Sequence, residues 1–196
     1  MHIILDFETA GQPHDGKILN VAYTHFDMYE VEDIADIRNR VEFHKLNFTA
    51  SDQEYRGYDK ETMDWWKQTA PDLIKQTFGN PESGITLTKF LEKFANYLQM
   101  YYNDSCCIWS RGNAFDITIL DVEYRRLFGK LPYPFWQVRD TRSFLDPMNI
   151  ISGKVNKRLF SGNINGLKQE YIAHDPIDDI AKDIQQIQLA YNTYKG

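Results

Sequence analysis

The sequence begins with a short apolar run that ends in two closely spaced carboxylates. Ile3-Ile4-Leu5 leads into Asp6 and Glu8, and residues spaced i, i+2 project from the same face of an extended strand. Two like charges buried side by side are unfavourable unless a positive charge lies between them. A divalent metal ion is the usual source of that charge. The segment therefore predicts a buried strand that delivers carboxylates to a metal site.

Composition bounds the class of protein. The chain has 196 residues, 42% of them hydrophobic and 26% charged, which is typical of one globular domain over residues 1–196 with a sizeable core. No apolar stretch approaches a membrane-spanning length and no signal-peptide pattern is present, so we expect no membrane partner. Cys106 and Cys107 are adjacent, which disfavours an ordinary disulfide and leaves no second pair for a zinc site. We therefore expect a reducing, cytoplasmic location.

Charge is unevenly distributed along the chain. The net charge of −6 argues against a general coating of nucleic acid. Between Arg125 and Lys168, however, Lys and Arg far outnumber the two acids, Asp140 and Asp146. This stretch is either a solvated surface or a positive lip beside an acidic metal centre, and the second reading suits a polyanionic substrate.

Periodicity and capping signals predict an α/β order of elements. We expect strands at His2–Glu8, Lys17–Asp27, Ile37–Leu46 and Cys106–Ser110, and helices at Asp59–Thr69, Thr86–Tyr102, Ala114–Phe128 and Pro176 to about Tyr194. A loop rich in Gly, Asn and Ser is expected at Ser152–Gly166. This order fits a mixed sheet with helices on its faces. Sites in such sheets favour strand ends and helix starts.

A second acidic position lies at one expected helix start. Asn113 is a good N-cap residue, and Asp116 three residues later completes a pattern similar to a capping box. A purely structural role is therefore one interpretation of this pair. The alternative is that Asp116 points from the first turn of the helix towards Asp6 and Glu8.

A third acidic segment precedes the last expected helix. Asp175 as N-cap and Pro176 at the first helical position make a clean helix start. His174 and Asp179 then occupy positions that pack against each other. Asp178 and Asp179 also suit the helix dipole without any catalytic role. Each feature alone has a structural explanation, but their joint occurrence indicates chemistry.

Taken together, Asp6, Glu8, Asp116, Asp179 and His174 resemble the ligand set of the DEDDh exonucleases in the DnaQ-like, RNase H-like superfamily. The motifs occur in order across nearly the whole chain. The resemblance implies an α/β fold with an RNase H-like mixed five-stranded sheet and helices on both faces. Further segments are similar to the subgroup that contains T-even phage exonuclease A and bacterial 3′–5′ exoribonucleases: Thr62–Lys67, Trp109–Gly112, and Ala173–Asp175 with Ala181–Asp183. Pro176-Ile177 departs from many relatives, but it lies between the key positions.

The resemblance also implies a mechanism. It assigns two divalent ions to the four carboxylates, and oxygen-only ligands favour Mg²⁺ or Mn²⁺ over zinc. His174 would act as general base, since imidazole groups take up protons near neutral pH. The expected reaction releases nucleoside 5′-monophosphates from the 3′ end of single-stranded nucleic acid. DNA is slightly favoured, and a 3′–5′ exoribonuclease acting on RNA or short oligoribonucleotides is the alternative.

Substrate contacts are expected from aromatic, hydroxyl and basic side chains near these motifs. Met63 and Trp66 would wedge against terminal bases, although at least one of the paired tryptophans is expected in the core. Phe7 and Phe115 either stack on the terminal nucleotide or pack internally. The remaining candidates are Thr9 for the terminal sugar, Arg111, Arg139 and Arg142 for the phosphates, and Asn113 of the second motif.

Two functions from other classes compete with this interpretation. A non-catalytic domain of the same fold could bind nucleic acid or protein, but it should have lost a carboxylate or the histidine. A nucleotide-binding α/β domain would need a Gly-rich phosphate cradle, which the sequence lacks. The aromatic content permits a homodimer without requiring one.

Overall fold

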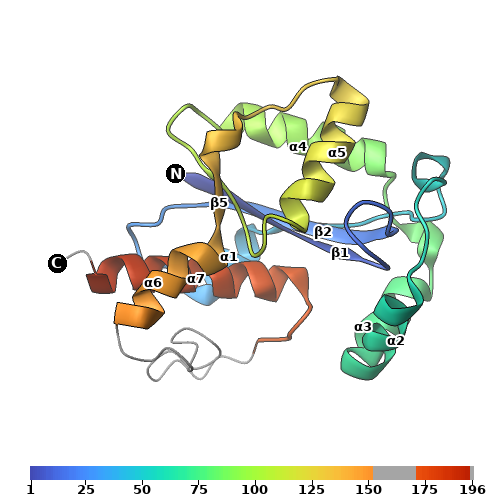
Figure 1. Cartoon of the computed structure of the whole chain (residues 1–196), viewed down its shortest axis with the longest axis horizontal. Helices are drawn as coiled ribbons and strands as arrows, with labels where there is room; N and C mark the ends of the chain where they lie inside the picture. Colours follow the sequence, from blue (N-terminus) through green and yellow to red (C-terminus); the bar gives the residue numbers. More distant parts are fainter. Residues whose placement is uncertain (152–170, 195–196) are drawn as a thin grey trace.

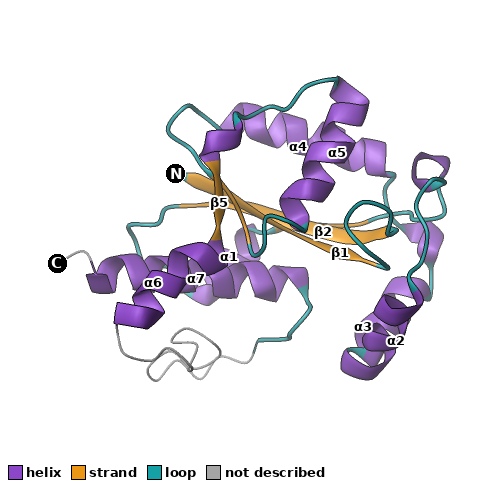
Figure 2. Cartoon of the chain, in the orientation of Figure 1, coloured by secondary structure: helices purple, strands orange, loops and turns teal. Residues whose placement is uncertain are grey.

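The computed structural model describes residues 1–151 and 171–194, and its centre is a five-stranded mixed sheet (Figure 2). The strand order is β3-β2-β1-β4-β5. β1 pairs antiparallel with β2 and β2 with β3, whereas β1, β4 and β5 run parallel. The strands are β1 (His2–Thr9), β2 (Ile18–Phe26), β3 (Glu42–Lys45), β4 (Ile108–Ser110) and β5 (Val138–Asp140).

Helices cover both faces of this sheet (Figure 1). One face carries α4 (Leu87–Tyr101) and α5 (Asp116–Phe128), and the opposite face carries α1 (Ile34–Arg40), α6 (Thr141–Ile151) and α7 (Pro176–Tyr194). The consecutive helices α2 (Lys60–Thr69) and α3 (Pro71–Phe78) stand at one end of the sheet. None of the described helices combines the length and apolar character that crossing a membrane requires.

The side chains of β1 alternate between two hydrophobic cores. Ile3 and Phe7 pack in the core beneath α4 and α5, while Ile4 packs with Ile180 and Ile184 of α7. Burying each such side chain is worth about 1.5–3 kcal/mol, so a shift of one residue in register is strongly disfavoured. The even-numbered face of β1 continues into the two carboxylates and meets α7. The predicted strand and its shared acidic face are confirmed.

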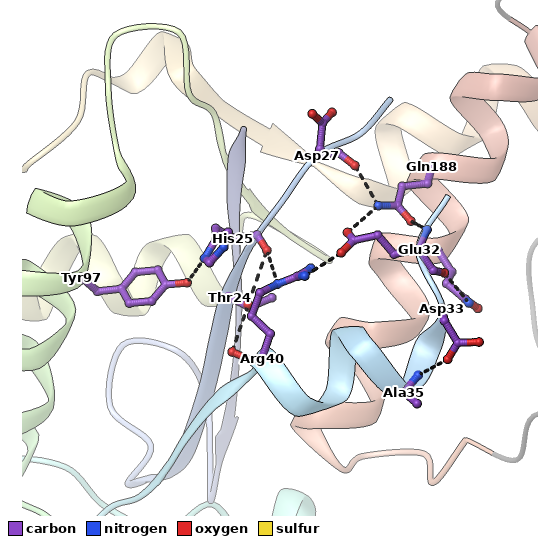
Figure 3. A network of polar contacts seen from close by, with 10 residues as sticks. Thr24, His25, Asp27, Glu32, Asp33, Ala35, Arg40, Tyr97 and Gln188 are labelled. Carbon is purple, nitrogen blue, oxygen red and sulfur yellow. Dashed lines mark hydrogen bonds and ion pairs between the residues drawn. The ribbon is translucent and has the colours of Figure 1, made fainter. Parts of the chain in front are cut away.

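A polar network fixes α7 against β2 and the segment that follows it (Figure 3). The buried Gln188 donates through Nε2 to the Asp27 carbonyl and to Glu32 Oε1, both at 2.8 Å. Arg40 Nη1 donates to Glu32 Oε2 at 2.6 Å, and Arg40 Nε donates to the His25 carbonyl at 3.1 Å. The network therefore holds the helix whose N-terminal end carries the third acidic motif.

The strand predicted at Ile37–Leu46 is wrong in its first half. Residues Ile34–Arg40 form α1, with Asp33 as the N-cap that accepts a hydrogen bond from the Ala35 amide at 2.7 Å. Ile34 and Ile37 are both buried and lie three residues apart, which is helical spacing. The strand proper begins only at Glu42.

Three other elements were not predicted. Pro71 follows α2 and also occupies the first turn of a further helix, α3. At that position the backbone N–H has no partner within the helix, so a proline loses no hydrogen bond there. β5 and α6 lie in the stretch that the sequence left unassigned. The loop expected at Ser152–Gly166, which holds part of the basic stretch, lies outside the described residues.

Candidate active site

Asp116 links α5 to the acidic end of β1. It begins the helix, is 3% exposed, and accepts a hydrogen bond through Oδ1 from the Phe7 amide at 2.9 Å. That amide lies between Asp6 and Glu8 in the chain. The prediction that Asp116 points back to this pair is confirmed.

The predicted N-cap role of Asn113 is wrong, because α5 begins three residues later with Phe115 as its N-cap residue. Asn113 instead fixes the turn between β4 and α5. Its amide donates to Asp140 Oδ2 at 2.8 Å, and its Oδ1 accepts from Ser110 Oγ at 3.0 Å. The backbone N–H of Asn113 thus contacts the end of β5, and its side chain contacts the end of β4.

The third motif adopts the local geometry that its sequence predicts. Asp175 Oδ1 accepts from the Ile177 amide at 2.9 Å, and α7 begins at Pro176. The His174 amide donates to Asp179 Oδ2 at 2.9 Å, so the two residues are neighbours as expected. His174 has a φ of 66°, a left-handed conformation that is uncommon for residues other than glycine. Such backbone strain persists where surrounding contacts determine it.

The three motifs converge on one cavity of about 380 Å³. All five residues of the DEDDh pattern line it: Asp6, Glu8, Asp116, His174 and Asp179. Ligand atoms of Glu8, His174 and Asp179 lie within 4.8 Å of one another. Elements distant in sequence, β1, α5 and α7, therefore bring their polar side chains together at one end of the sheet.

The cavity holds more negative charge than its surroundings neutralise. Burial raises the pKa of Asp6 well above its ordinary value, and repulsion from Asp116, Glu8 and Asp179 raises it further. Burial and the same kind of repulsion raise the pKa of Glu8. Burial raises the pKa of Asp116 to about 7, although the hydrogen bond from the Phe7 amide opposes this shift. Each of these carboxyl groups is therefore harder to ionise than it would be in water.

The donor set fits divalent cations. Asp6 Oδ2 is buried and has no hydrogen-bond partner in the described structure, an arrangement that is costly unless a cation binds there. Its neighbours are carboxylate oxygens, which are the ligands that Mg²⁺ and Mn²⁺ prefer. The chemistry of the residues present thus suits the ions that the sequence motifs imply.

Sequence reasoning assigned no role to another buried acid, Asp183. It is 3% exposed, lines the same cavity, and accepts from Arg111 Nε at 2.6 Å. Arg111 also donates to Gln186, so this guanidinium is held by two side chains of α7. Asp183 follows Asp179 by four residues, and this one-turn spacing on a helix was the available signal. Asp179 Oδ1 in turn accepts from Lys182 Nζ at 2.5 Å.

Arg142 enters the cavity beside a glycine. Its Nη1 lies 2.5 Å from where a Cβ on Gly112 would stand, and Gly112 has a φ of +109°. A side chain at position 112 would therefore collide with the guanidinium and strain the backbone. Arg139, in contrast, is exposed and donates to the carbonyls of Trp136 and Val138.

A second cavity of about 520 Å³ adjoins the first, since both are lined by Glu8 and Phe115. Trp66 and Thr9 also line it. Trp66 is only 4% exposed, and its Nε1 donates to the Thr9 carbonyl at 2.9 Å. The Thr9 hydroxyl donates to the Gly11 carbonyl at 2.6 Å. Thr9 and Trp66 are therefore fixed parts of the cavity wall.

Two other predicted contact residues pack against hydrophobic clusters. Phe7 is 3% exposed and packs edge-on against Phe90 with ring centroids 5.7 Å apart. Met63 packs on a small cluster that includes Phe48. Trp65, for which no role was predicted, is 43% exposed and lies beside His174. Its exposure could not be deduced from the adjacent pair of tryptophans alone.

Known proteins share the sequence pattern of this chain. The family model described as the 3′-5′ exoribonuclease Rv2179c-like domain matches residues 1–188. An exodeoxyribonuclease of Enterobacteria phage T4 is 30% identical over 211 residues, which cover 98% of this chain and 90% of the phage protein. Both matches extend from the first acidic motif through the third.

Solved structures share the fold at much lower identity. E. coli exonuclease I in complex with an oligonucleotide has a TM-score of 0.61 at 15% identity, and the match covers 97% of this chain but only 40% of that one. The nuclease domain of 3′hExo, a DEDDh family member bound to rAMP, has a TM-score of 0.51 at 13% identity, covering 97% of this chain and 90% of that domain. The chain belongs to the Rv2179c-like 3′–5′ exoribonuclease domain family and is a DnaQ-like 3′–5′ exonuclease.

Proposed function

We propose that this exonuclease removes nucleotides one at a time from the 3′ end of single-stranded DNA and releases nucleoside 5′-monophosphates. The observation that carries the proposal is the convergence of the acidic motifs on one cavity, with a buried Asp6 oxygen that lacks a partner among the described residues. Similarity to the phage exodeoxyribonuclease over 98% of the chain supports DNA. The description of the matching family as exoribonucleases supports RNA as the second candidate.

In this proposal Asp6, Glu8, Asp116 and Asp179 hold two divalent ions, Mg²⁺ or Mn²⁺. Such ions, when bound, activate a water for attack on the phosphodiester and stabilise charge on the departing 3′ oxygen. The carboxylates gain from binding, because cations offset the burial and the repulsion that together raise the pKa values of Asp6 and Glu8. Lys182 would then exchange its contact with Asp179 for one with solvent or substrate.

His174 is assigned the role of general base. The ring lies in the acidic cavity, and its ligand atom is within 4.8 Å of oxygens of Glu8 and Asp179. From there the imidazole takes the proton of the attacking water. The hydrogen bond from the His174 amide to Asp179 fixes the backbone that carries the ring.

The second cavity is assigned to the terminal nucleotide. Phe115 lines both cavities and offers a ring for stacking, while Thr9 and Trp66 form the wall. Arg142, which lines the acidic cavity, is placed to contact the phosphate. Roles for Phe7, Met63, Arg111, Asn113 and Arg139 stay predictions, since each has structural contacts of its own.

Matched oligonucleotides test this function. A single strand labelled at its 3′ terminus should lose the label in the first turnover with Mg²⁺, and EDTA should stop the reaction. Scattered internal cuts would contradict the proposal. Faster hydrolysis of the RNA version would favour the second candidate, and a DNA strand ending in one ribonucleotide would show whether the terminal sugar decides.

A further inference from the structure

The aromatic pair on α2 approaches the third motif. The rings of Trp65 and His174 meet edge to face with centroids 4.7 Å apart, and Trp66 lies 6.0 Å from the same imidazole. Trp66 is anchored by its hydrogen bond to the Thr9 carbonyl. Trp65 packs against Trp66 at 5.3 Å, so the anchored ring supports the exposed one.

The backbone and the ring of His174 are held by different contacts. Its amide is bonded to Asp179, and its φ of 66° is fixed by the turn before α7. No hydrogen bond to a ring nitrogen of His174 occurs within residues 1–151 and 171–194. Rotation of the imidazole about its side-chain bonds is therefore limited by the neighbouring indoles rather than by a polar partner.

Trp65 also faces the other cavity. It lines the 520 Å³ cavity together with Glu8 and Phe115, while His174 lines the 380 Å³ cavity with the same two residues. The indole thus stands between the space assigned to the terminal nucleotide and the imidazole. A nucleotide that fills the second cavity would limit the movement of Trp65, and through it the movement of His174.

We propose that Trp65 is a positioning residue, which seats the His174 imidazole for proton removal and tightens that seat when a nucleotide occupies the adjoining cavity. The proposal rests on the proposed role of His174 as general base. Small displacements of a reacting group are costly, and one ångström can reduce a rate about 10²-fold. Loss of the indole should therefore lower kcat more than it raises KM.

A double-mutant cycle separates this role from base stacking. Trp65→Ala should lower kcat about 10-fold and change KM by less than about 3-fold, while Trp65→Phe should restore most of the rate. In a His174→Ala background the same Trp65→Ala change should cost nothing further. An equal loss in both backgrounds, or a loss confined to KM, would overturn the positioning role. Trp136→Ala is the matched control, because this tryptophan is 64% exposed and lines neither cavity.

The imidazole itself gives a readout that does not depend on turnover. In the metal-free protein, the ring proton signals of His174 should be displaced by the indole and should move towards ordinary values in Trp65→Leu. Signals that stay in place would overturn the proposal. A His174→Ala variant with full activity would instead refute the general-base role, so the two failures are distinguishable.

Discussion

Two buried carboxylates on α5 are in opposite circumstances. Asp116 at the first turn and Glu123 further along are each 3% exposed. Glu123 accepts from Arg56 Nε at 3.2 Å and Nη2 at 2.6 Å, and it also accepts from the Tyr55 hydroxyl. Asp116 accepts from the Phe7 amide and lies near other acids, Asp6 and Asp183, whose repulsion the nearby Arg142 only partly offsets. One helix thus contains a neutralised carboxylate and one that is not.

The difference separates stability from function. Arg56 also donates to the Gly16 carbonyl at 2.6 Å, so the pair with Glu123 joins two loops to α5. In the acidic cavity, by contrast, Asp6 and Glu8 have no such basic partner, and burial together with repulsion from neighbouring acids raises the pKa of each. Charges of this kind are retained when a ligand supplies the balancing charge.

The largest effect is expected from neutralising Asp6. Asp6→Asn should reduce the rate of 3′-end hydrolysis about 10⁴-fold, which corresponds to roughly 5.5 kcal/mol of transition-state stabilisation. The metal-free variant should be at least as stable as the parent, since the change removes repulsion. Single-turnover kinetics and urea unfolding measure the two quantities. Asp72→Asn, at an aspartate whose side chain is 90% exposed, is the control; a less than 10-fold loss for Asp6→Asn would contradict the ligand assignment.

The converse change is Glu123→Gln. Removing one partner of a buried ion pair leaves the Arg56 guanidinium uncompensated and should lower the free energy of unfolding by about 3–5 kcal/mol. Hydrolysis per folded molecule should persist, because Glu123 does not line the acidic cavity. Urea unfolding measures the loss of stability, and the hydrolysis rate divided by the concentration of folded protein measures the activity. Unchanged stability would mean that this pair does not tie the loops as described.

Metal ions should stabilise the folded state only by binding in the acidic cavity. At a Mg²⁺ concentration 100 times its dissociation constant, the free energy of unfolding should rise by about 2.7 kcal/mol. Glu123→Gln should keep this increment, whereas Asp6→Asn should lose most of it. Thermal unfolding over a Mg²⁺ series, with and without EDTA, provides the measurement. An equal increment in all three proteins would place the ion elsewhere.

The smallest predicted effect is a pH dependence of the metal-free protein. Burial raises the pKa of Asp116 from 3.8 to about 7, so near neutral pH the folded state binds a proton that the unfolded state has released. Its contribution to stability therefore falls as pH rises, by about 1 kcal/mol between pH 6 and pH 7. Asp116→Asn should remove this slope, and saturating Mg²⁺ should suppress it.

His2 provides an internal check on the sign of that measurement. Burial lowers its pKa from 6.5 to about 4, so the unfolded state binds more protons within this window. Stability from this group is full above pH 6.5 and is lost as pH falls towards 4. The two groups act in opposite directions, and the difference between the parent and Asp116→Asn isolates the carboxylate. A difference that rises with pH would refute the assigned shift.

Local chemistry made much of the site predictable from sequence. Alternation in β1 placed Asp6 and Glu8 on one face, and the Asp175-Pro176 start of α7 placed His174 beside Asp179. These features depend on neighbouring residues and on strand or helix period alone. The fold and the exonuclease activity were indicated by the resemblance of these motifs, in this order, to the DEDDh exonucleases.

The remainder depends on contacts between distant segments. Ile34 and Ile37 satisfy helical spacing, yet they are followed directly by strand residues, so the sequence pattern was ambiguous. β5 has three residues and is defined by its pairing with β4, which a sequence pattern does not reveal. The contact between Trp65 and His174 likewise joins two elements whose relative position arises only on folding.

The spread of the site over β1, α5 and α7 has a consequence for biosynthesis. A ribosome makes Asp6 and Glu8 early, but Asp179 and His174 follow only after every other described strand and helix. A nascent polypeptide therefore lacks one of the four carboxylates of the proposed cation site, and the proposed general base, until α7 has emerged. On the proposed assignments, hydrolytic capacity is gained at that late moment of translation rather than gradually.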